Sequence, residues 1–486
     1  MKKLTLTIIS SALLISGCSM TPDYERPSVS VADVYLHASN SKEIQQQLTQ
    51  QNWWYKFADE QLIELVEDVQ QQNINIKQAS ERINAAKAYH QSVASYKVPT
   101  LSLNAGVVDL RFSENEAVAG GLIGDIALPD SFGGGYISGA SRDSKDHFIG
   151  LNASWELDIF GRIDSMSAAA KIRAEQAEVM KTAVNTAVTA DVINNYLQYR
   201  GAQSRLTIAQ QNVVQQEQSL ALVRSLFENG YSSELDIANE KTMLATTKSA
   251  LLPLKTAQQV HLNRIAILLG ESVNQTKLRF TDAPLPQMQG LVPTGLPSQL
   301  LTRRPDIALA EREIAAKNEE VGAAIAAKYP SLFLTGAPSF VAGDFDDLIN
   351  SDSISWSLGA GVSWNIFDGG RAEAMVDMQK ASFKQSVLSY QHTVNAAFNE
   401  VETTLYAYAN AQQFNTQISK AVSHAEMALN KARVLYRAGL IDHISVLNAQ
   451  KQNNQLKDAE VLARLNTATT VVMLHKSLGG DWQIKK

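Results

Sequence analysis

The sequence predicts a mainly α-helical protein with four β-strands, built from two copies of one structural unit. Landmarks of the first half recur 209 positions later, so that Trp155 matches Trp364 and Gly230 matches Gly439. Four segments alternate between apolar and polar residues with a period of two, which is typical of strands with unlike faces. Two stretches of roughly 65 residues lack proline and keep a seven-residue apolar rhythm, which indicates long helices.

A second register links the residues upstream of these landmarks. There the shift is 231 positions, and it pairs Ile76 with Ile307 and Pro99 with Pro330. The difference of 22 residues falls between Pro99 and Trp155. We therefore expect a loop in that place, because loops tolerate changes of length that helices and strands do not.

The first residues have the pattern of a bacterial export signal. Lys2 and Lys3 precede an apolar stretch, and small residues lead up to Cys18, the only cysteine. We expect residues 1–17 to be removed. The cysteine in this setting resembles a lipobox, which implies lipidation of Cys18, and Ser19 after it favours the outer membrane. The alternative is an ordinary signal peptide with an incidental cysteine.

The composition excludes some partners. The net charge of −6 argues against nucleic acid. After the signal no apolar run of about 18 or more residues occurs, so any crossing of a membrane has to be made by strands.

The four strands are expected at about 98–112, 146–159, 331–341 and 353–366. In the last of them Trp356 and Trp364 lie on the apolar face, roughly 27 Å apart at about 3.4 Å per residue. This approaches the height of an outer-membrane apolar band, so we predict that both, together with Trp155, are membrane-interface aromatics. The alternative is a strand of a soluble sandwich, which has the same alternation.

Four strands cannot close into a barrel, and an open edge cannot face lipid because its amides would lack hydrogen-bond partners. If these strands lie in a membrane, several chains must combine them.

The helices predict the remaining domain organisation. Each long helix ends at a glycine, Gly230 or Gly439, and a return helix follows, which Pro253 interrupts in the first copy. One further helix leads up to the strands of each copy, over 60–95 and 306–328. The expected organisation is a lipidated segment (18–58), a first repeat (59–270), a linker that wraps the helices (271–296), a second repeat (297–479) and a short tail (480–486).

Several motifs in order resemble one family. The lipobox is followed by Thr21-Pro-Asp-Tyr-Glu-Arg-Pro27, by Arg303-Arg-Pro-Asp-Ile307, by a Gly-Gly-Arg371 turn and by the Tyr436-Arg-Ala-Gly439 helix tip. Over essentially the whole mature chain, the sequence resembles the TolC-like outer-membrane factors, and more narrowly the NodT-type lipoproteins of resistance-nodulation-division pumps.

This resemblance implies a homotrimer, with twelve pooled strands in one barrel and a periplasmic tunnel of coiled-coil helices. It implies a passive exit duct for drugs and small toxic compounds, lipid-anchored in the outer membrane and extending into the periplasm. The implied partners are a periplasmic adaptor, an inner-membrane pump and outer-membrane lipid.

The resemblance also implies site residues. Relatives close the periplasmic end with a Leu-Asp-Ala-Gln-Arg stretch, and this chain has Asn448 for the Asp and Lys451 for the Arg, which are not equivalent. With Asp442 and Ile444, these are the gate candidates, and we expect a weaker electrostatic gate. Adaptor contacts are expected at the tips, at Gly230, Tyr231, Gly439 and Leu440. For the glycines, the alternative is helix termination alone.

The sequence shows no motif for catalysis or for metal binding. The histidines show no metal-ligand spacing, and His443 is expected to be a solvated cap. Met375 and Met378, one turn apart, are expected to pack rather than to bind metal. The sequence thus predicts no enzyme, no cofactor and no metal site. The alternatives to drug efflux are type I protein secretion, metal-ion efflux and a structural envelope lipoprotein without a pore.

Overall fold

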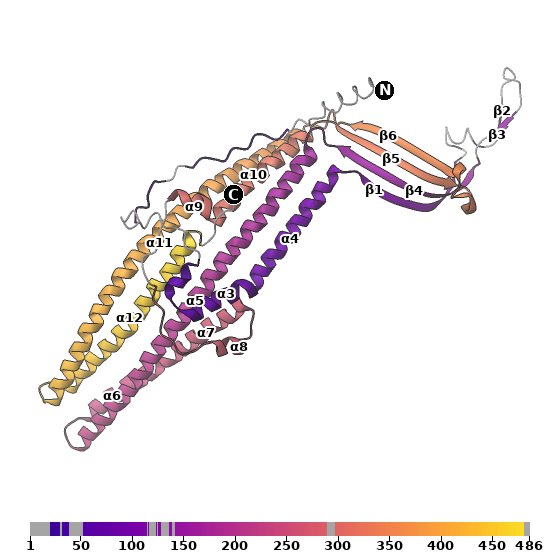
Figure 1. Cartoon of the computed structure of the whole chain (residues 1–486). Helices are drawn as coiled ribbons and strands as arrows, with labels where there is room; N and C mark the ends of the chain where they lie inside the picture. Colours follow the sequence, from indigo (N-terminus) through magenta and orange to yellow (C-terminus); the bar gives the residue numbers. More distant parts are fainter. Residues whose placement is uncertain are drawn as a thin grey trace. The chain divides into compact units, whose positions relative to one another are not determined.

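The computed structural model describes residues 20–29, 32–37, 52–113, 115, 123, 125–127, 136–138, 141–288 and 297–480 (Figure 1). The predicted signal peptide, Cys18 and residues 481–486 lie outside these ranges. The chain divides into two compact units. The first holds residues 87–172 and 315–385 with the start of the chain, and the second holds residues 26–86, 173–314 and 386–486.

Four antiparallel strands of the first unit form one sheet (Figure 1). They are β1 (Thr100–Arg111), β4 (Asp143–Leu157), β5 (Ser331–Ala342) and β6 (Ile354–Ser363), in the order β1-β4-β5-β6. Leu103 lies opposite Leu151 in the first pair, and Leu332 lies opposite Val362 in the last. Within the described residues, β1 and β6 each pair with a single strand, so the sheet has two open edges. The predicted set of four strands is confirmed.

The bounds of two strands differ from the prediction. β4 begins at Asp143 rather than at 146 and ends at Leu157 rather than at 159. β6 ends at Ser363 rather than at 366, because the following residues turn toward Asp368. The Asp368 carboxylate accepts hydrogen bonds from the amides of Gly370 and Ala372, and so begins the next helix. The predicted loop between β1 and β4 contains the short paired strands β2 (Asp125–Ala127) and β3 (Tyr136–Ser138).

Large apolar side chains of the sheet are exposed. Every residue of β6 is exposed, and Trp356, Leu358 and Val362, which share one face of the strand, retain 69%, 77% and 68% of their accessible surface. Ser355 and Ser357 alternate with them on the other face. An apolar face of this kind marks a surface that is covered by something outside the single chain.

The two repeats use the same bonds where a helix passes into a strand. The indole N–H of Trp155 donates to the Lys97 carbonyl at 3.1 Å, and that of Trp364 donates to the Lys328 carbonyl at 3.0 Å. An ion pair at this joint is also present in both repeats, between Lys97 and Asp164 in the first and between Lys328 and Glu373 in the second. In each of these contacts one partner follows the 231-position shift and the other follows the 209-position shift. The same joint between helix and strand is therefore present in both repeats.

The helices differ widely in length. They are α3 (Glu60–Gln72), α4 (Ile74–Ala94), α5 (Arg162–Glu228), α6 (Glu234–Ser249), α7 (Leu251–Leu269), α8 (Val273–Arg279), α9 (Pro297–Arg303), α10 (Pro305–Ala326), α11 (Arg371–Arg437) and α12 (His443–Ser477), with short 3-10 turns η1 (Trp53–Phe57), η2 (Ser95–Lys97), η5 (Phe345–Asp347) and η6 (Ser351–Ser353). In the described ranges no helix is both long and apolar enough to cross a bilayer.

Helix breaks follow local chemistry. The first return helix divides at Ala250, and Pro253 then lies in the first turn of α7, where its missing N–H costs least, whereas α12 is continuous. The single helix predicted over 60–95 is wrong, because Asn73 divides it. The Asn73 side chain accepts from the amides of Asn75 and Ile76 and donates to the Leu268 carbonyl at 2.7 Å.

The core of the second unit lies along the long helices. The predicted apolar rhythm places Ala209, Leu220 and Val223 of α5 in buried positions, and Val422, Ala425 and Leu429 of α11 likewise. Helix α12 approaches α5 closely at Gly201, where a β-carbon would lie 2.7 Å from the Leu465 side chain. The described part of the linker crosses α3 and α5, since Arg279 pairs with Asp68 and the Thr281 carbonyl accepts from Arg200.

A buried histidine near the end of α12 predicts acid sensitivity of the second unit. The His475 ring stacks on Trp53 at 4.2 Å, and burial, with Lys56 and Arg303 adding to it, lowers the pKa of His475 to about 3. Below pH 6.5 the unfolded chain binds a proton that the folded chain does not, so stability falls as the pH falls. We expect this group to remove about 2 kcal/mol between pH 7 and pH 5.

Urea unfolding followed by circular dichroism at both pH values checks this expectation. His475→Phe should lose less stability on acidification than the wild type, whereas His392→Phe, at an exposed position of α11, should lose as much. An equal loss in all three proteins would contradict the assignment.

Candidate gate at the helix tips

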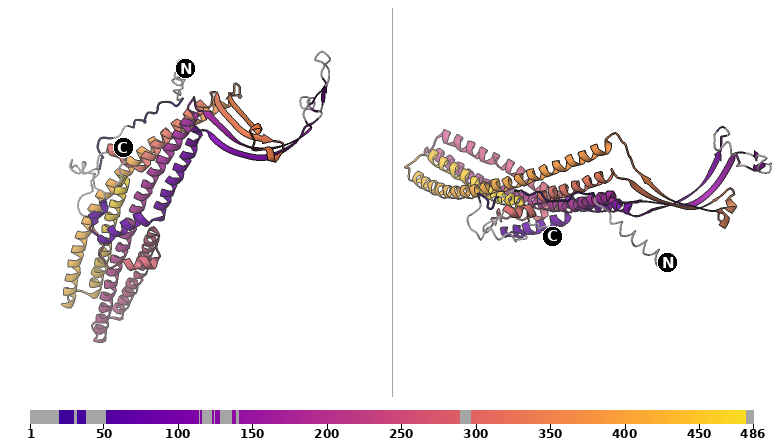
Figure 2. Two further views of the ribbon diagram at one scale, coloured as in Figure 1. Left: turned by 45° about the vertical axis from the view of Figure 1, so that its right-hand side comes forward. Right: turned by 90° about the horizontal axis from the view of Figure 1, so that it is seen from above.

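The second unit ends in two helical hairpins, α5 with α6 and α11 with α12, that lie side by side (Figures 1 and 2). Both tips turn through a left-handed glycine, with φ of 78° at Gly230 and 74° at Gly439. In each tip the amide after the glycine donates to the carbonyl five residues earlier, at 2.8 and 3.0 Å, which is the Schellman helix stop. The residues that follow the two glycines, Tyr231 and Leu440, are 81% and 70% exposed.

The other gate candidates lie on one stripe of α12. Ile444, Asn448 and Lys451 follow one another at helical spacing, and all three are exposed in the single chain. The residues one position away form the buried side of the helix: His443, Leu447 and Gln450. The structure thus brings these three candidates onto a common face, and their role in gating stays a prediction.

Asp442 has a different surrounding from these three. It is the N-cap of α12, and its carboxylate accepts from the Ser445 amide at 2.8 Å and from the Ser445 hydroxyl at 2.5 Å. These two hydrogen bonds lower the pKa of the Asp442 carboxyl. The carboxylate therefore remains charged at the helix start, where it also interacts favourably with the helix dipole.

The prediction that His443 is a solvated cap is wrong. Its side chain is 7% exposed, and its Nε2 lies 2.6 Å from Oε1 of Glu240, a fully buried carboxylate on α6. Glu240 is not among the residues that the sequence predicts for this site. No local signal indicates this pair, because the two residues belong to different hairpins and are 203 positions apart.

The three tryptophans predicted at the membrane interface differ in their contacts. Trp155 is half-buried and Trp364 is 56% exposed, and both indole N–H groups are already bonded to carbonyls at the helix-to-strand joint. Trp364 lies one residue beyond β6, and Trp356 lies within it. Their placement at a lipid boundary stays a prediction.

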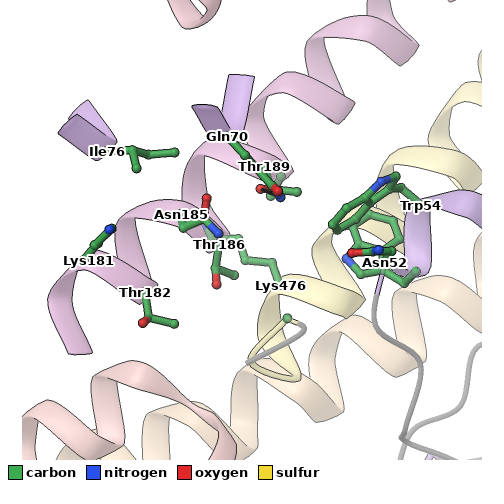
Figure 3. A pocket seen from close by; sticks show the side chains of 13 residues that line it. Asn52, Trp54, Gln70, Ile76, Lys181, Thr182, Asn185, Thr186, Thr189 and Lys476 are labelled. Atoms are coloured by element: carbon green, nitrogen blue, oxygen red, sulfur yellow. Dashed lines mark hydrogen bonds between the residues drawn. The ribbon is translucent and has the colours of Figure 1, made fainter. Parts of the chain in front are cut away.

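A cavity of about 650 Å³ lies beside α5 in the second unit (Figure 3). Its labelled lining is mostly polar, with Thr182, Asn185, Thr186 and Thr189 of α5 and Lys476 of α12. The described residues contain no group of three or more His, Cys, Asp or Glu side chains arranged to hold a metal ion. None of the residues that line the cavity is an Asp, Glu, His or Cys.

Paired helical hairpins joined to an open-edged sheet with an exposed apolar face define a channel protein whose strands are completed by other chains. The chain belongs to the outer membrane efflux protein family, whose sequence model matches residues 65–271 and 296–480. This is a family of outer-membrane efflux channels and not a family of enzymes.

Relatives match the chain over nearly its full length. It is 29% identical over 483 residues to the solvent efflux pump outer membrane protein SrpC of Pseudomonas putida, covering 98% of this chain and 97% of the relative. It is 29% identical over 479 residues to the cation efflux system protein CusC of Escherichia coli, covering 97% of each. The solved structure of the outer-membrane channel OprN matches with a TM-score of 0.85 at 29% identity, covering 96% of this chain and all of that one.

Proposed function

We propose that three copies of the chain form one passive exit duct of a tripartite efflux system, anchored in the outer membrane through a lipid on Cys18. The four strands of each copy combine into a twelve-stranded barrel, and the helical hairpins form a tunnel in the periplasm. A periplasmic adaptor couples this tunnel to an inner-membrane pump. The duct itself carries out no chemical reaction.

One observation supports this proposal above the others, namely the open-edged sheet with its exposed apolar face. Unpaired strand amides are costly in lipid, and joining β6 of one copy to β1 of the next removes every edge. Leu358 and its neighbours on β6 then face hydrocarbon, while Ser355 and Ser357 face a polar lumen.

Conductance tests the proposal. The purified lipoprotein is expected to migrate as a heat-modifiable trimer and to give discrete current steps in planar lipid bilayers. Deletion of its gene should raise the sensitivity of the cell to small toxic compounds. A monomer without ion current would contradict the duct and would favour a structural envelope lipoprotein.

The cargo proposed for this duct is small organic compounds. The SrpC relative is named for solvents and the CusC relative for cations, at the same identity to this chain. The pump, rather than a wide tunnel, selects what passes. Uptake and sensitivity assays with solvents, drugs and copper or silver salts separate these cargoes, and loss of protein secretion alone would indicate a type I system.

The exposed tips are the proposed adaptor contacts. A photo-crosslinking amino acid placed at Tyr231 or at Leu440 is expected to form an adduct with the adaptor in intact cells, because both residues lie in the hairpin turns and both side chains are exposed. The same probe at Leu278, which is 87% exposed on α8, serves as the control. If neither tip forms an adduct with the adaptor, the assignment of the tips as adaptor contacts is wrong.

The electrostatics of the gate predict weak cation selectivity. With an amide at Asn448, the proposed trimer lacks a ring of three carboxylates at that level, so Asn448→Asp is expected to raise the cation-to-anion permeability ratio about threefold or more at low salt. Asp442→Asn should lower the ratio of the wild type, because the hydrogen bonds to Ser445 keep that exposed carboxylate charged. Strong wild-type selectivity that Asn448→Ala abolishes would contradict this prediction. Reversal potentials measure it.

A further inference from the structure

The cavity beside α5 has a positively charged lining. Lys181 of α5 and Lys476 of α12 both line it, and no carboxylate does (Figure 3). In the described ranges, no hydrogen bond or ion pair joins either ammonium group to another residue. Two like charges that line one space repel each other, and an anion between them removes this repulsion. The cavity therefore favours a negatively charged occupant.

The lining also holds hydrogen-bond donors that lack acceptors. Trp54 is 4% exposed, and its buried Nε1–H group has no hydrogen-bond partner among the described residues. Asn185, one turn after Lys181 on α5, likewise makes no hydrogen bond with them. A buried donor without an acceptor is costly and rare in native proteins. The free donors and the two cations favour the same kind of ligand atom, an oxygen that carries negative charge.

The charged and donor groups stand on segments that are fixed by other contacts. The Trp53 ring stacks on the His475 ring at 4.2 Å between centroids. Trp54 follows Trp53 in η1, and Lys476 follows His475 in α12. This one stack therefore fixes the positions of two groups that line the cavity.

Helix α5 is tied to its neighbours on both sides of the cavity. Gln70 of α3 donates to the Thr189 hydroxyl of α5 at 3.1 Å. After α12 the chain passes so close to α5 that a β-carbon at Gly480 would lie 2.8 Å from the Thr186 side chain. The Gly480 carbonyl also accepts from Arg303 at 3.0 Å. Groups that are positioned before a ligand arrives lose little freedom when it binds.

The size of the cavity indicates an organic ligand rather than a simple ion. Cavities of about 300–1,000 Å³ hold small organic molecules, and this one measures about 650 Å³. In Figure 3, Thr182, Asn185 and Thr186 follow one another along α5, and they add hydroxyl and amide groups to the lining. Such groups bond to the hydroxyl groups of a polar ligand such as a sugar.

We propose that this cavity binds a small, oxygen-rich organic anion that carries two acidic groups, carboxylates or phosphates, on a polar frame. Lys181 and Lys476 bind the acidic groups, and the Trp54 indole N–H and the Asn185 side chain bond to ligand oxygens. Because the cavity is lined by η1, α5 and α12, a bound anion joins segments that are far apart in the sequence and stabilises the second unit. This inference goes beyond the duct and does not depend on it.

Isothermal titration calorimetry of the full-length lipoprotein in lipid nanodiscs tests the site and requires no ion current. The two probes are fructose bisphosphate and glucarate, which carry two phosphates or two carboxylates on a sugar frame. Binding of either supports the site, and the tighter of the two identifies the acidic group. Fructose and inorganic phosphate should each bind about tenfold or more weakly, because each offers only part of the ligand. Binding should also weaken as the salt concentration rises.

Variants assign the binding to the cavity. Lys181→Met and Lys476→Met should each weaken it about tenfold or more, because each removes a charge-assisted bond. Trp54→Phe keeps most of the ring but removes the N–H, and should weaken binding about fivefold. The matched control is Lys241→Met, at an exposed lysine of α6 outside the cavity, which should bind like the wild type. Far-UV circular dichroism should show that all four variants remain folded.

Several results would overturn the site. A wild type that binds neither probe would do so, and so would full binding by both cavity lysine variants. An equal loss in Lys241→Met would show that exposed lysines in general attract the probes. Inorganic phosphate that binds as tightly as fructose bisphosphate would reduce the cavity to a site for a simple ion. Binding that appears only in Asp481→Asn would show that the acidic residue after Gly480 is the occupant.

Discussion

Replacing Leu358 by arginine is expected to destabilise the assembled channel by about 2–4 kcal/mol per chain, the cost of a cation at the bilayer midplane on the lipid face of a strand. Leu358 lies in the middle of β6 and is 77% exposed in the single chain. A soluble protein would tolerate this change at an exposed position with little loss. The heat-modifiable trimer, measured by its dissociation temperature on gels, should therefore be lost or strongly weakened.

Ser357 offers a matched control because it lies next to Leu358 and points to the other face of the same strand. Ser357→Arg should leave the trimer stable and should lower cation permeability, since the added charge faces the lumen. Equal stability of the two variants would show that the apolar face of the sheet does not meet lipid. Reduced stability of Ser357→Arg alone would indicate that the two faces are assigned the wrong way round.

Arg200→Met is expected to lower the free energy of unfolding of the second unit by about 3 kcal/mol, because it removes a buried cation and leaves its acceptors without donors. The Arg200 guanidinium is fully buried. It donates to the Thr281 carbonyl and to Gln203, each at 2.6 Å, and also to Gln61. It lies 5.2 Å from the Tyr196 ring centroid as well. The linker after α8 should lose its attachment to α5.

Arg264→Met provides the comparison, since Arg264 pairs with Asp191 at 2.6 Å but is half exposed. An exposed ion pair contributes less than about 1 kcal/mol. Guanidinium unfolding followed by circular dichroism measures both variants, and limited proteolysis after Phe280 reports on the linker. Arg200→Lys should recover only part of the loss, because an ammonium lacks the planar fork of donors. Similar losses for Arg200→Met and Arg264→Met would contradict this account.

The sequence alone predicted much of the framework, for reasons that are local. The period of two in β6 placed Trp356 and Leu358 on one face because successive side chains of a strand point to opposite sides. Gly230 and Gly439 predicted the tips because the left-handed helix stop favours glycine, and Pro253 predicted the break of the first return helix. The repeat register carried each of these signals from one copy to the other.

Tertiary structure alone decided which distant polar groups meet. Asn73 ends α3 because its side chain bonds both the next helix and the Leu268 carbonyl, and the helical pattern of the sequence continues through it. The sequence predicts His443 as a solvated cap and gives no signal for Glu240, and the two become a buried pair only when α6 and α12 lie together. Side-chain periodicity specifies which face of an element is apolar, but the meeting of two polar groups depends on how far each helix is rotated and shifted against the other.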